Sequence, residues 1–209
     1  MSAVFDMIYY INMDKDVDRN ENMIKLFKDL KLDTYTRIKG EKVDYRDYDE
    51  STYRNFNKRD EKYLNGALGC RLSHINLVKH AKENNYERIL VLEDDVWVDP
   101  ALDLNQMLTL NYWNIINSDM CYFGGMVEQH MRNQIVCTHA FSLNQRTYDD
   151  ILNMCDASGM EVDNFYAKVL QHMSRNDRPQ GKYTINQVFP FNAFQQNSEF
   201  QSNIQNKEL

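Results

Sequence analysis

The chain alternates short apolar runs with longer segments in which apolar residues recur at helical spacing. Runs rich in β-branched and aromatic residues predict strands at 4–13, 34–38, 88–92, 120–123, 134–143 and 182–189. Helical spacing predicts helices at 18–30, 67–84, 100–116, 145–155 and 162–173. Strands that alternate with helices predict an α/β fold, with a mostly parallel central sheet of about six strands flanked by helices.

Two predicted helices have specific sequence features, one a capping pattern at its start and the other an apolar stripe along its length. Asp18 with Glu21 three residues later resembles a capping box that opens the first helix. The helix at 67–84 has an apolar stripe formed by Leu68, Leu72, Ile75 and Val78. The segment 41–63 before it is polar and rich in tyrosine, which predicts an irregular excursion or a small helix.

Length and composition narrow the class of protein. The 209 residues suit a single domain over 1–209, and 43% hydrophobic residues indicate a globular core. The net charge of −7 argues against nucleic acid as a partner. The sequence has no signal-peptide pattern and no run of the ~18–20 apolar residues that a membrane span needs. The four scattered cysteines are expected to be reduced, and the predicted location is cytoplasmic.

The strand at 88–92 runs straight into three carboxylates, Glu93, Asp94 and Asp95. A buried strand should not end on three negative charges unless they are paired or solvated. A divalent cation is one explanation, and a solvated acidic turn is the other. Side chains alternate along a strand, so Glu93 and Asp95 would share one face and Asp94 would point to the other. The first explanation makes Glu93 and Asp95 the predicted metal ligands.

Several glycines and polar residues lie where a ligand could approach the backbone. Asn12 and Arg19 follow the first strand and can bind a base, ribose or phosphate. Gly66 and Gly69 at the start of a helix permit close ligand approach, or else tight packing of that helix on the sheet. Gly124-Gly125 after a strand allows a sugar or phosphate to approach, or forms a plain turn.

For His74 and Asp163, a structural role explains the residue at least as well as a catalytic role does. His74 next to Ser73 is more often a structural histidine than a catalytic one. Asp163 lies at the start of a predicted helix, where the helix dipole alone favours a carboxylate.

The order of these motifs resembles glycosyltransferase family 25, which includes lipooligosaccharide and procollagen galactosyltransferases. The resemblance rests on Ile11-Asn12-Met13-Asp14, on Arg37-Ile38-Lys39-Gly40, on Gly69-Cys70 with Ser73-His74, and on Leu92-Glu93-Asp94-Asp95. The segment Glu161-Val162-Asp163 is similar to a later element of the family, with Met160-Glu161 in place of its proline. The chain also resembles virus-encoded glycosyltransferase domains in general character.

This resemblance implies a GT-A fold with a Rossmann-like sheet, a UDP-sugar donor, and Mn²⁺ or Mg²⁺ bound by Glu93 and Asp95. If the reaction inverts configuration, Asp163 is the carboxylate expected to act as catalytic base on the acceptor hydroxyl. The residues expected to bind the donor are Tyr10, Ile11, Asn12, Arg19, Arg37, Gly40, Ser73, Asp94, Gly124 and Gly125.

The expected activity is metal-dependent transfer of a hexose-type sugar from the UDP-sugar to a hydroxyl of a glycan or glycoprotein. If the reaction retains configuration, Gln187 or Gln195 becomes a candidate near the donor. The alternative is a module that binds a nucleotide sugar but has lost catalysis. A metal-dependent phosphatase or nuclease is disfavoured, because the sequence shows no second cluster of Asp and His for another metal. The cytoplasm would be that of the host if the chain is viral.

Overall fold

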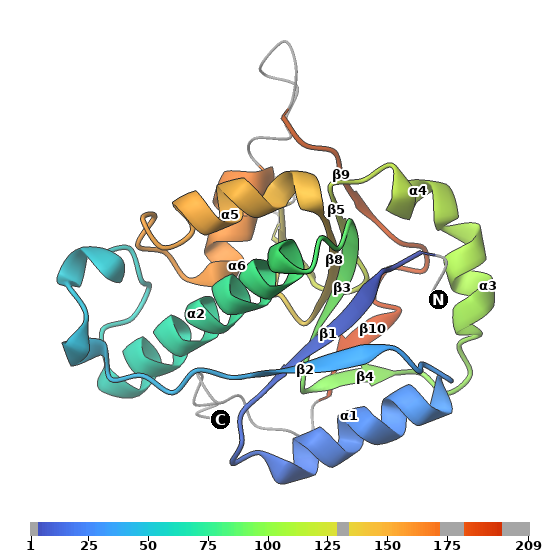
Figure 1. Cartoon of the computed structure of the whole chain (residues 1–209), viewed down its shortest axis with the longest axis horizontal. Helices are drawn as coiled ribbons and strands as arrows, with labels where there is room; N and C mark the ends of the chain where they lie inside the picture. The colour runs from blue at the N-terminus through green and yellow to red at the C-terminus, as the bar shows by residue number, and fades with distance from the viewer. Residues whose placement is uncertain (1–3, 129–133, 172–181, 198–209) are drawn as a thin grey trace.

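The computed structural model describes residues 4–128, 134–171 and 182–197, and its centre is a six-stranded sheet (Figure 1). All neighbouring strands are parallel except β8, which is antiparallel to both β3 and β5. The predicted α/β class with a mostly parallel sheet of about six strands is therefore confirmed. The strands in sheet order are β2 Tyr35–Lys39, β1 Met7–Asn12, β3 Arg88–Glu93, β8 Ala140–Asn144, β5 Met120–Tyr122 and β9 Ile185–Gln187.

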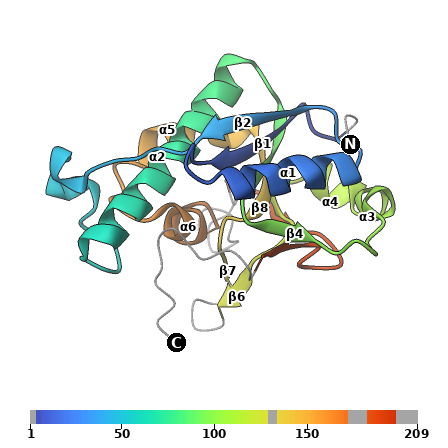
Figure 2. The same cartoon turned by 90° about the horizontal axis from the view of Figure 1, so that it is seen from below.

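Helices cover both faces of the sheet (Figure 1, Figure 2). One face packs against α1 Val17–Asp29, α3 Leu104–Leu110 and α4 Tyr112–Ile116. The other packs against α2 Glu61–Glu83, α5 Tyr148–Met154 and α6 Val162–Phe165. Strand β3 is buried on both sides, with Leu90 and Leu92 in the first core and Ile89 and Val91 in the second. This explains its unbroken apolar sequence.

Helix α2 begins six residues earlier than the sequence predicts. Asp60 caps it by accepting a hydrogen bond from the Tyr63 backbone N–H. The prediction from apolar spacing did not use this cap, and it therefore placed the start of the helix too late. Gly66 and Gly69 therefore lie inside the helix, and the expectation that they stand at its N-terminus is wrong. The rest of the polar segment holds two short 3₁₀ turns, η1 Tyr45–Asp47 and η2 Glu50–Thr52.

The first helix also starts differently from the prediction. Asp16 is its N-cap residue and Asp18 lies in the first turn, so the predicted capping box at Asp18 is not formed. The predicted helix at 100–116 is two helices, α3 and α4, which meet at Asn111. Asn111 donates to the carbonyl oxygens of Met107 and Phe189, which ties this junction to the chain after β9.

The predicted strand at 134–143 is broken into two. Cys137 has a φ of 75°, and the chain turns between β7 Gln134–Val136 and β8. Strand β7 pairs with β6 Met126–Glu128 in a separate two-stranded sheet. A second such sheet joins β4 Val96–Val98 to β10 Phe194–Gln196. The sequence did not predict the strands β4, β6 and β10.

The C-terminal helical elements are shorter than predicted. A 3₁₀ turn, η4 Gln145–Thr147, precedes α5, and α6 continues as a π-helical segment, η5 Tyr166–Leu170. Residues 172–173 of the predicted last helix lie outside the described residues. Within the part of the chain that the structure describes, no helix combines the length and the apolar character needed to cross a bilayer.

Candidate active site

A cleft of about 410 Å³ opens where β1 and β3 end and where α2 passes beside them. The carboxyl ends of neighbouring parallel strands meet at one edge of a sheet, and this is where ligands bind in open α/β folds. Eight of the predicted site residues line the cleft: Ile11, Asn12, Arg19, Gly40, Ser73, Glu93, Asp94 and Asp95.

Asp94 is held on both of its carboxylate oxygens. Arg19 Nη1 donates to Oδ1 at 2.6 Å, and Asn12 Nδ2 donates to Oδ2 at 2.8 Å. Arg37 Nε in turn donates to Asn12 Oδ1 at 2.9 Å. Burial raises the pKa of Asp94, while Arg19 and Asn12 oppose this shift by stabilising the ionised carboxylate. The network fixes the start of α1 to the end of β3.

Glu93 and Asp95 are neighbours whose charges act on each other. Burial and the nearby charge of Glu93 raise the pKa of Asp95 to about 6. Burial by itself would raise the pKa of Glu93, but the nearby His74 imidazole and the Thr138 hydroxyl favour the ionised carboxylate, and the pKa of Glu93 is lowered. Asp95 Oδ2 accepts from Gln196, whereas the buried Oδ1 has no hydrogen-bond partner among the described residues. The buried Asp95 carboxylate with its unused oxygen and the partly exposed Glu93 carboxylate beside it suit a hard divalent cation.

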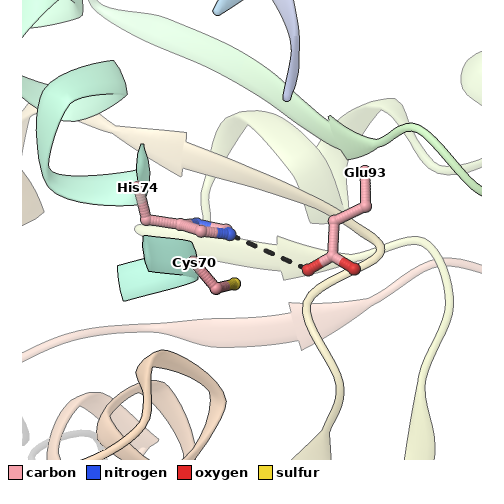
Figure 3. Close-up of side chains that lie close together, drawn as sticks. All are labelled: Cys70, His74 and Glu93. Atoms are coloured by element: carbon pink, nitrogen blue, oxygen red, sulfur yellow. Dashed lines mark ion pairs between the residues drawn. The ribbon is translucent and has the colours of Figure 1, made fainter. Parts of the chain in front are cut away.

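Glu93 is also in contact with the other side of the cleft. The Thr138 hydroxyl donates to Glu93 Oε1 at 2.5 Å, and His74 Nε2 lies 3.8 Å from the same oxygen. Figure 3 shows the side chains of Cys70 and His74 projecting from α2 toward the Glu93 carboxylate. The burial of Cys70, with the charge of Glu93 added, raises the pKa of this thiol well above its usual value.

The wall of the cleft between α2 and the chain after β2 depends on a glycine. A Cβ atom at Gly69 would lie 2.5 Å from the carbonyl oxygen of Glu41, so only glycine allows this approach. Ser73 fixes the same contact, because its hydroxyl accepts from the Glu41 N–H and donates to the Gly69 carbonyl oxygen. Gly69 therefore packs against the Glu41 backbone and not against the sheet, while Gly66 and Gly69 both line the cleft, so the approach of a ligand to them stays a prediction.

Five predicted site residues lie outside the residues that line the cleft. Tyr10 is buried and donates to Asn20, and Arg37 bonds to Asn12 and Asp14 behind the cleft wall. Gly124 packs against the carbonyl oxygen of Phe194 in β10.

The other two also have local structural contacts. A Cβ atom at Gly125 would lie 2.7 Å from Ile135 Cγ2. Asp163 is half-buried in the first turn of α6, where it accepts from the Asn164 N–H. Burial, with Glu161 and Glu93 adding to it, raises the pKa of Asp163.

The cleft contains residues that the sequence patterns did not single out. Lys15, Lys42 and Lys62 line it and bring positive charge next to the acidic strand end. Gln196 also lines it, while Gln195 pairs with Trp97 on β4, and Gln187 is an exposed residue of β9. The lysines come from three separate segments, and Gln196 joins the site through the β4–β10 pairing. Neither the convergence of the lysines nor the position of Gln196 can be predicted from a short stretch of sequence.

The described sheet and cleft define an α/β protein of the Rossmann-like kind, with its candidate site at the carboxyl ends of β1 and β3. The family model Glycosyltransferase family 25 (LPS biosynthesis protein) matches residues 5–166. The chain therefore belongs to glycosyltransferase family 25, as its motifs predicted.

Relatives of the same family occur in insects. The chain is 26% identical over 127 residues to a Glycosyltransferase 25 family member of Drosophila pseudoobscura pseudoobscura. It is 33% identical over 102 residues to one of Anopheles gambiae. These alignments cover 57% and 44% of this chain, but only 20% and 17% of the relatives. The chain thus spans about a fifth of the length of the curated relatives it matches.

A solved structure has the same fold. It is described as the crystal structure of a glycosyltransferase involved in the glycosylation of the major capsid of PBCV-1. The TM-score is 0.50 at 11% identity, and the match covers 79% of this chain and 76% of that chain. This likeness supports the predicted GT-A type of fold, whose central sheet here carries a cleft at its carboxyl edge.

Proposed function

We propose that this chain catalyses metal-dependent transfer of a hexose-type sugar from a UDP-sugar to a hydroxyl of a glycan or glycoprotein. The observation that carries the proposal is the Glu93–Asp95 pair at the end of β3, inside a cleft that also contains basic side chains. Family membership adds the reaction class. Location in the cytoplasm remains a prediction from the sequence.

Glu93 and Asp95 are the residues proposed to hold Mn²⁺ or Mg²⁺. The raised pKa of Asp95 reflects its burial and the nearby negative charge of Glu93, and a cation would relieve this repulsion. Asp95 Oδ1, which is buried without a hydrogen-bond partner among the described atoms, is a ready ligand atom. When bound, the cation supplies Lewis-acid stabilisation of the negative charge on the departing UDP.

The donor is proposed to lie along the part of the cleft formed by β1 and α1. Asn12 and Arg19 are fixed by Asp94, so these side chains are already ordered before a ligand arrives. Lys15, Lys42 and Lys62 supply positive charge for a diphosphate. Tyr10 and Arg37 would act from behind the wall by holding Asn20 and Asn12 in place.

Asp163 is proposed to accept the proton of the acceptor hydroxyl if the reaction inverts configuration. Burial raises its pKa, which makes it a stronger base than an exposed aspartate. Gly124 and Gly125 remain candidates for the sugar side of the site. Their packing against β10 and β7 accounts for the glycines without a ligand.

The test is UDP binding by calorimetry with and without Mn²⁺, followed by a screen of UDP-sugars for release of UDP. Asp95→Asn should lose the Mn²⁺-dependent part of UDP binding. Asp99→Asn is the matched control, because Asp99 is exposed four residues away and its side chain accepts from the Ala101 N–H. UDP affinity that is unaffected by Mn²⁺, or no affinity at all, would contradict the proposal.

The same experiment separates the alternatives. A module that has lost catalysis would bind UDP with Mn²⁺ but release none from any UDP-sugar and acceptor. A phosphatase would release phosphate in place of UDP. The transferase, the inactive module and the phosphatase would all use the acidic end of β3. The products of turnover therefore distinguish these candidates, and UDP binding alone does not.

A further inference from the structure

Three potential metal ligands of different chemistry converge on one side of the cleft. Cys70 and His74 are four residues apart on α2, so their side chains lie on one helix face. Glu93 reaches them from the end of β3, as Figure 3 shows. One ligand atom from each of the three residues lies within 4.8 Å of the other two.

The spacing between His74 and Glu93 fits two ligands of one cation better than it fits a hydrogen bond. His74 Nε2 lies 3.8 Å from Glu93 Oε1, beyond hydrogen-bonding distance. The His74 side chain is 1% exposed, and Nε2 has no hydrogen-bond partner among the described atoms. Ligand atoms of a tetrahedral zinc ion stand roughly 3.5 Å apart at normal bond lengths.

We propose that Cys70, His74 and Glu93 form a binding site for a thiophilic divalent cation of the Zn²⁺ type. A thiolate and a carboxylate balance the two positive charges, and the thiol proton is released to solvent on binding. Sulfur and imidazole nitrogen select Zn²⁺ over the oxygen-preferring Mn²⁺ and Mg²⁺. All three residues line the cleft, so the fourth coordination position faces it and a cation can enter.

This site shares Glu93 with the proposed donor-metal pair. A thiophilic cation on Cys70 and His74 would withdraw Glu93 from Asp95, and it would thereby block the Mn²⁺ site. Only this consequence rests on the proposed transferase function. Binding of Zn²⁺ itself follows from the three side chains and stands apart from any activity.

The direct test is titration of the metal-free full chain with Co²⁺, followed by Zn²⁺. One equivalent of Co²⁺ should produce the thiolate-to-cobalt charge-transfer absorption, and one equivalent of Zn²⁺ should abolish it. Cys70→Ser should remove the absorption, and His74→Gln should weaken Zn²⁺ binding at least about tenfold. Cys137→Ser is the matched control, because Cys137 is a partly exposed cysteine outside the cleft lining. Absorption that persists in Cys70→Ser overturns the proposal.

A second measurement, cysteine alkylation, uses only the wild-type protein, so a variant that fails to fold does not affect it. Alkylation of wild-type cysteines is followed by peptide mass spectrometry with and without Zn²⁺. Zn²⁺ should slow alkylation of Cys70 at least about tenfold and leave Cys137 unchanged. An unchanged Cys70 rate overturns the site.

The shared use of Glu93 has its own readout. Mn²⁺-dependent UDP binding should fall at least about tenfold in wild type when Zn²⁺ saturates the site, and much less in Cys70→Ser. If UDP does not bind under any condition, the proposed transferase function fails, while the Co²⁺ and alkylation results still decide the Zn²⁺ site. If UDP binds equally well with Zn²⁺ present, Glu93 is not shared.

Discussion

Arg19 and Asp94 form a buried ion pair that joins α1 to the acidic end of β3. Arg19 Nη1 lies 2.6 Å from Asp94 Oδ1, and the two side chains are 10% and 9% exposed. Because a buried charge without its partner is costly, this pair constrains where the edge of the cleft can form. The prediction that Asp94 points away from Glu93 and Asp95 is wrong, because β3 ends at Glu93 and Asp94 and Asp95 follow in a turn. All three carboxylates line the cleft, and Asp94 differs in being held by Arg19 and Asn12.

Arg19→Met should destabilise the protein by about 3 kcal/mol, because it leaves Asp94 buried with only Asn12 as a partner. Urea denaturation monitored by circular dichroism gives the free energy of unfolding. Arg46→Met is the control, since Arg46 pairs with Asp44 on the surface and its loss should leave the midpoint nearly unchanged. Equal effects of the two substitutions would contradict a buried role for the Arg19–Asp94 pair.

Asp95→Asn should stabilise the metal-free protein at about pH 7.5 by about 1–3 kcal/mol. The pKa of Asp95 is raised from 3.8 to about 6, so the native state binds a proton more tightly than the unfolded chain. Wild-type stability therefore falls as pH rises from about 4 through about 6. The substituted amide does not titrate, so the advantage of the variant should shrink at about pH 4.5. Denaturation curves in chelator at both pH values test this, with the exposed Asp99→Asn as the control variant.

Gly69→Ala should destabilise the protein, although alanine is the better helix former by about 1 kcal/mol. The new methyl would meet the Glu41 carbonyl oxygen at 2.5 Å and force the cleft wall away from α2. Gly66→Ala, three residues earlier on the same helix at a partly exposed position, should be neutral or stabilising. Thermal unfolding of the two variants side by side distinguishes packing from helix propensity, and equal shifts would rule out the packing explanation.

The sequence predicted the sheet well because β3 and β1 have unbroken apolar runs whose burial on both faces requires no distant information. The prediction from sequence failed where a single residue, or pairing with a distant strand, determines where an element begins or ends. Asp60 extends α2 back by six residues through its cap, and the turn at Cys137 divides one predicted strand into β7 and β8. Strand β10 forms only by pairing with β4, nearly a hundred residues away along the chain.

The candidate site was predicted best where all of its residues follow one strand. Glu93, Asp94 and Asp95 are adjacent in sequence, so strand geometry alone assigned them to a common edge. The contact of His74 with Glu93 depends on the register of α2 against β3, which no local pattern encodes. For the same reason the sequence could not tell that Gly124 packs against β10.

Asp163→Asn should lower kcat at least about 100-fold without changing UDP affinity, if this carboxylate is the base. Burial raises the pKa of Asp163, so the base is ionised only above that raised pKa. Transfer should therefore decline as pH falls through it, and this acid limb should be absent from the residual activity of the variant. Asp149→Asn is the control, because Asp149 is likewise an acid in the first turn of a helix and is exposed. If both variants retain kcat, Asp163 serves only to favour the start of α6 through the helix dipole.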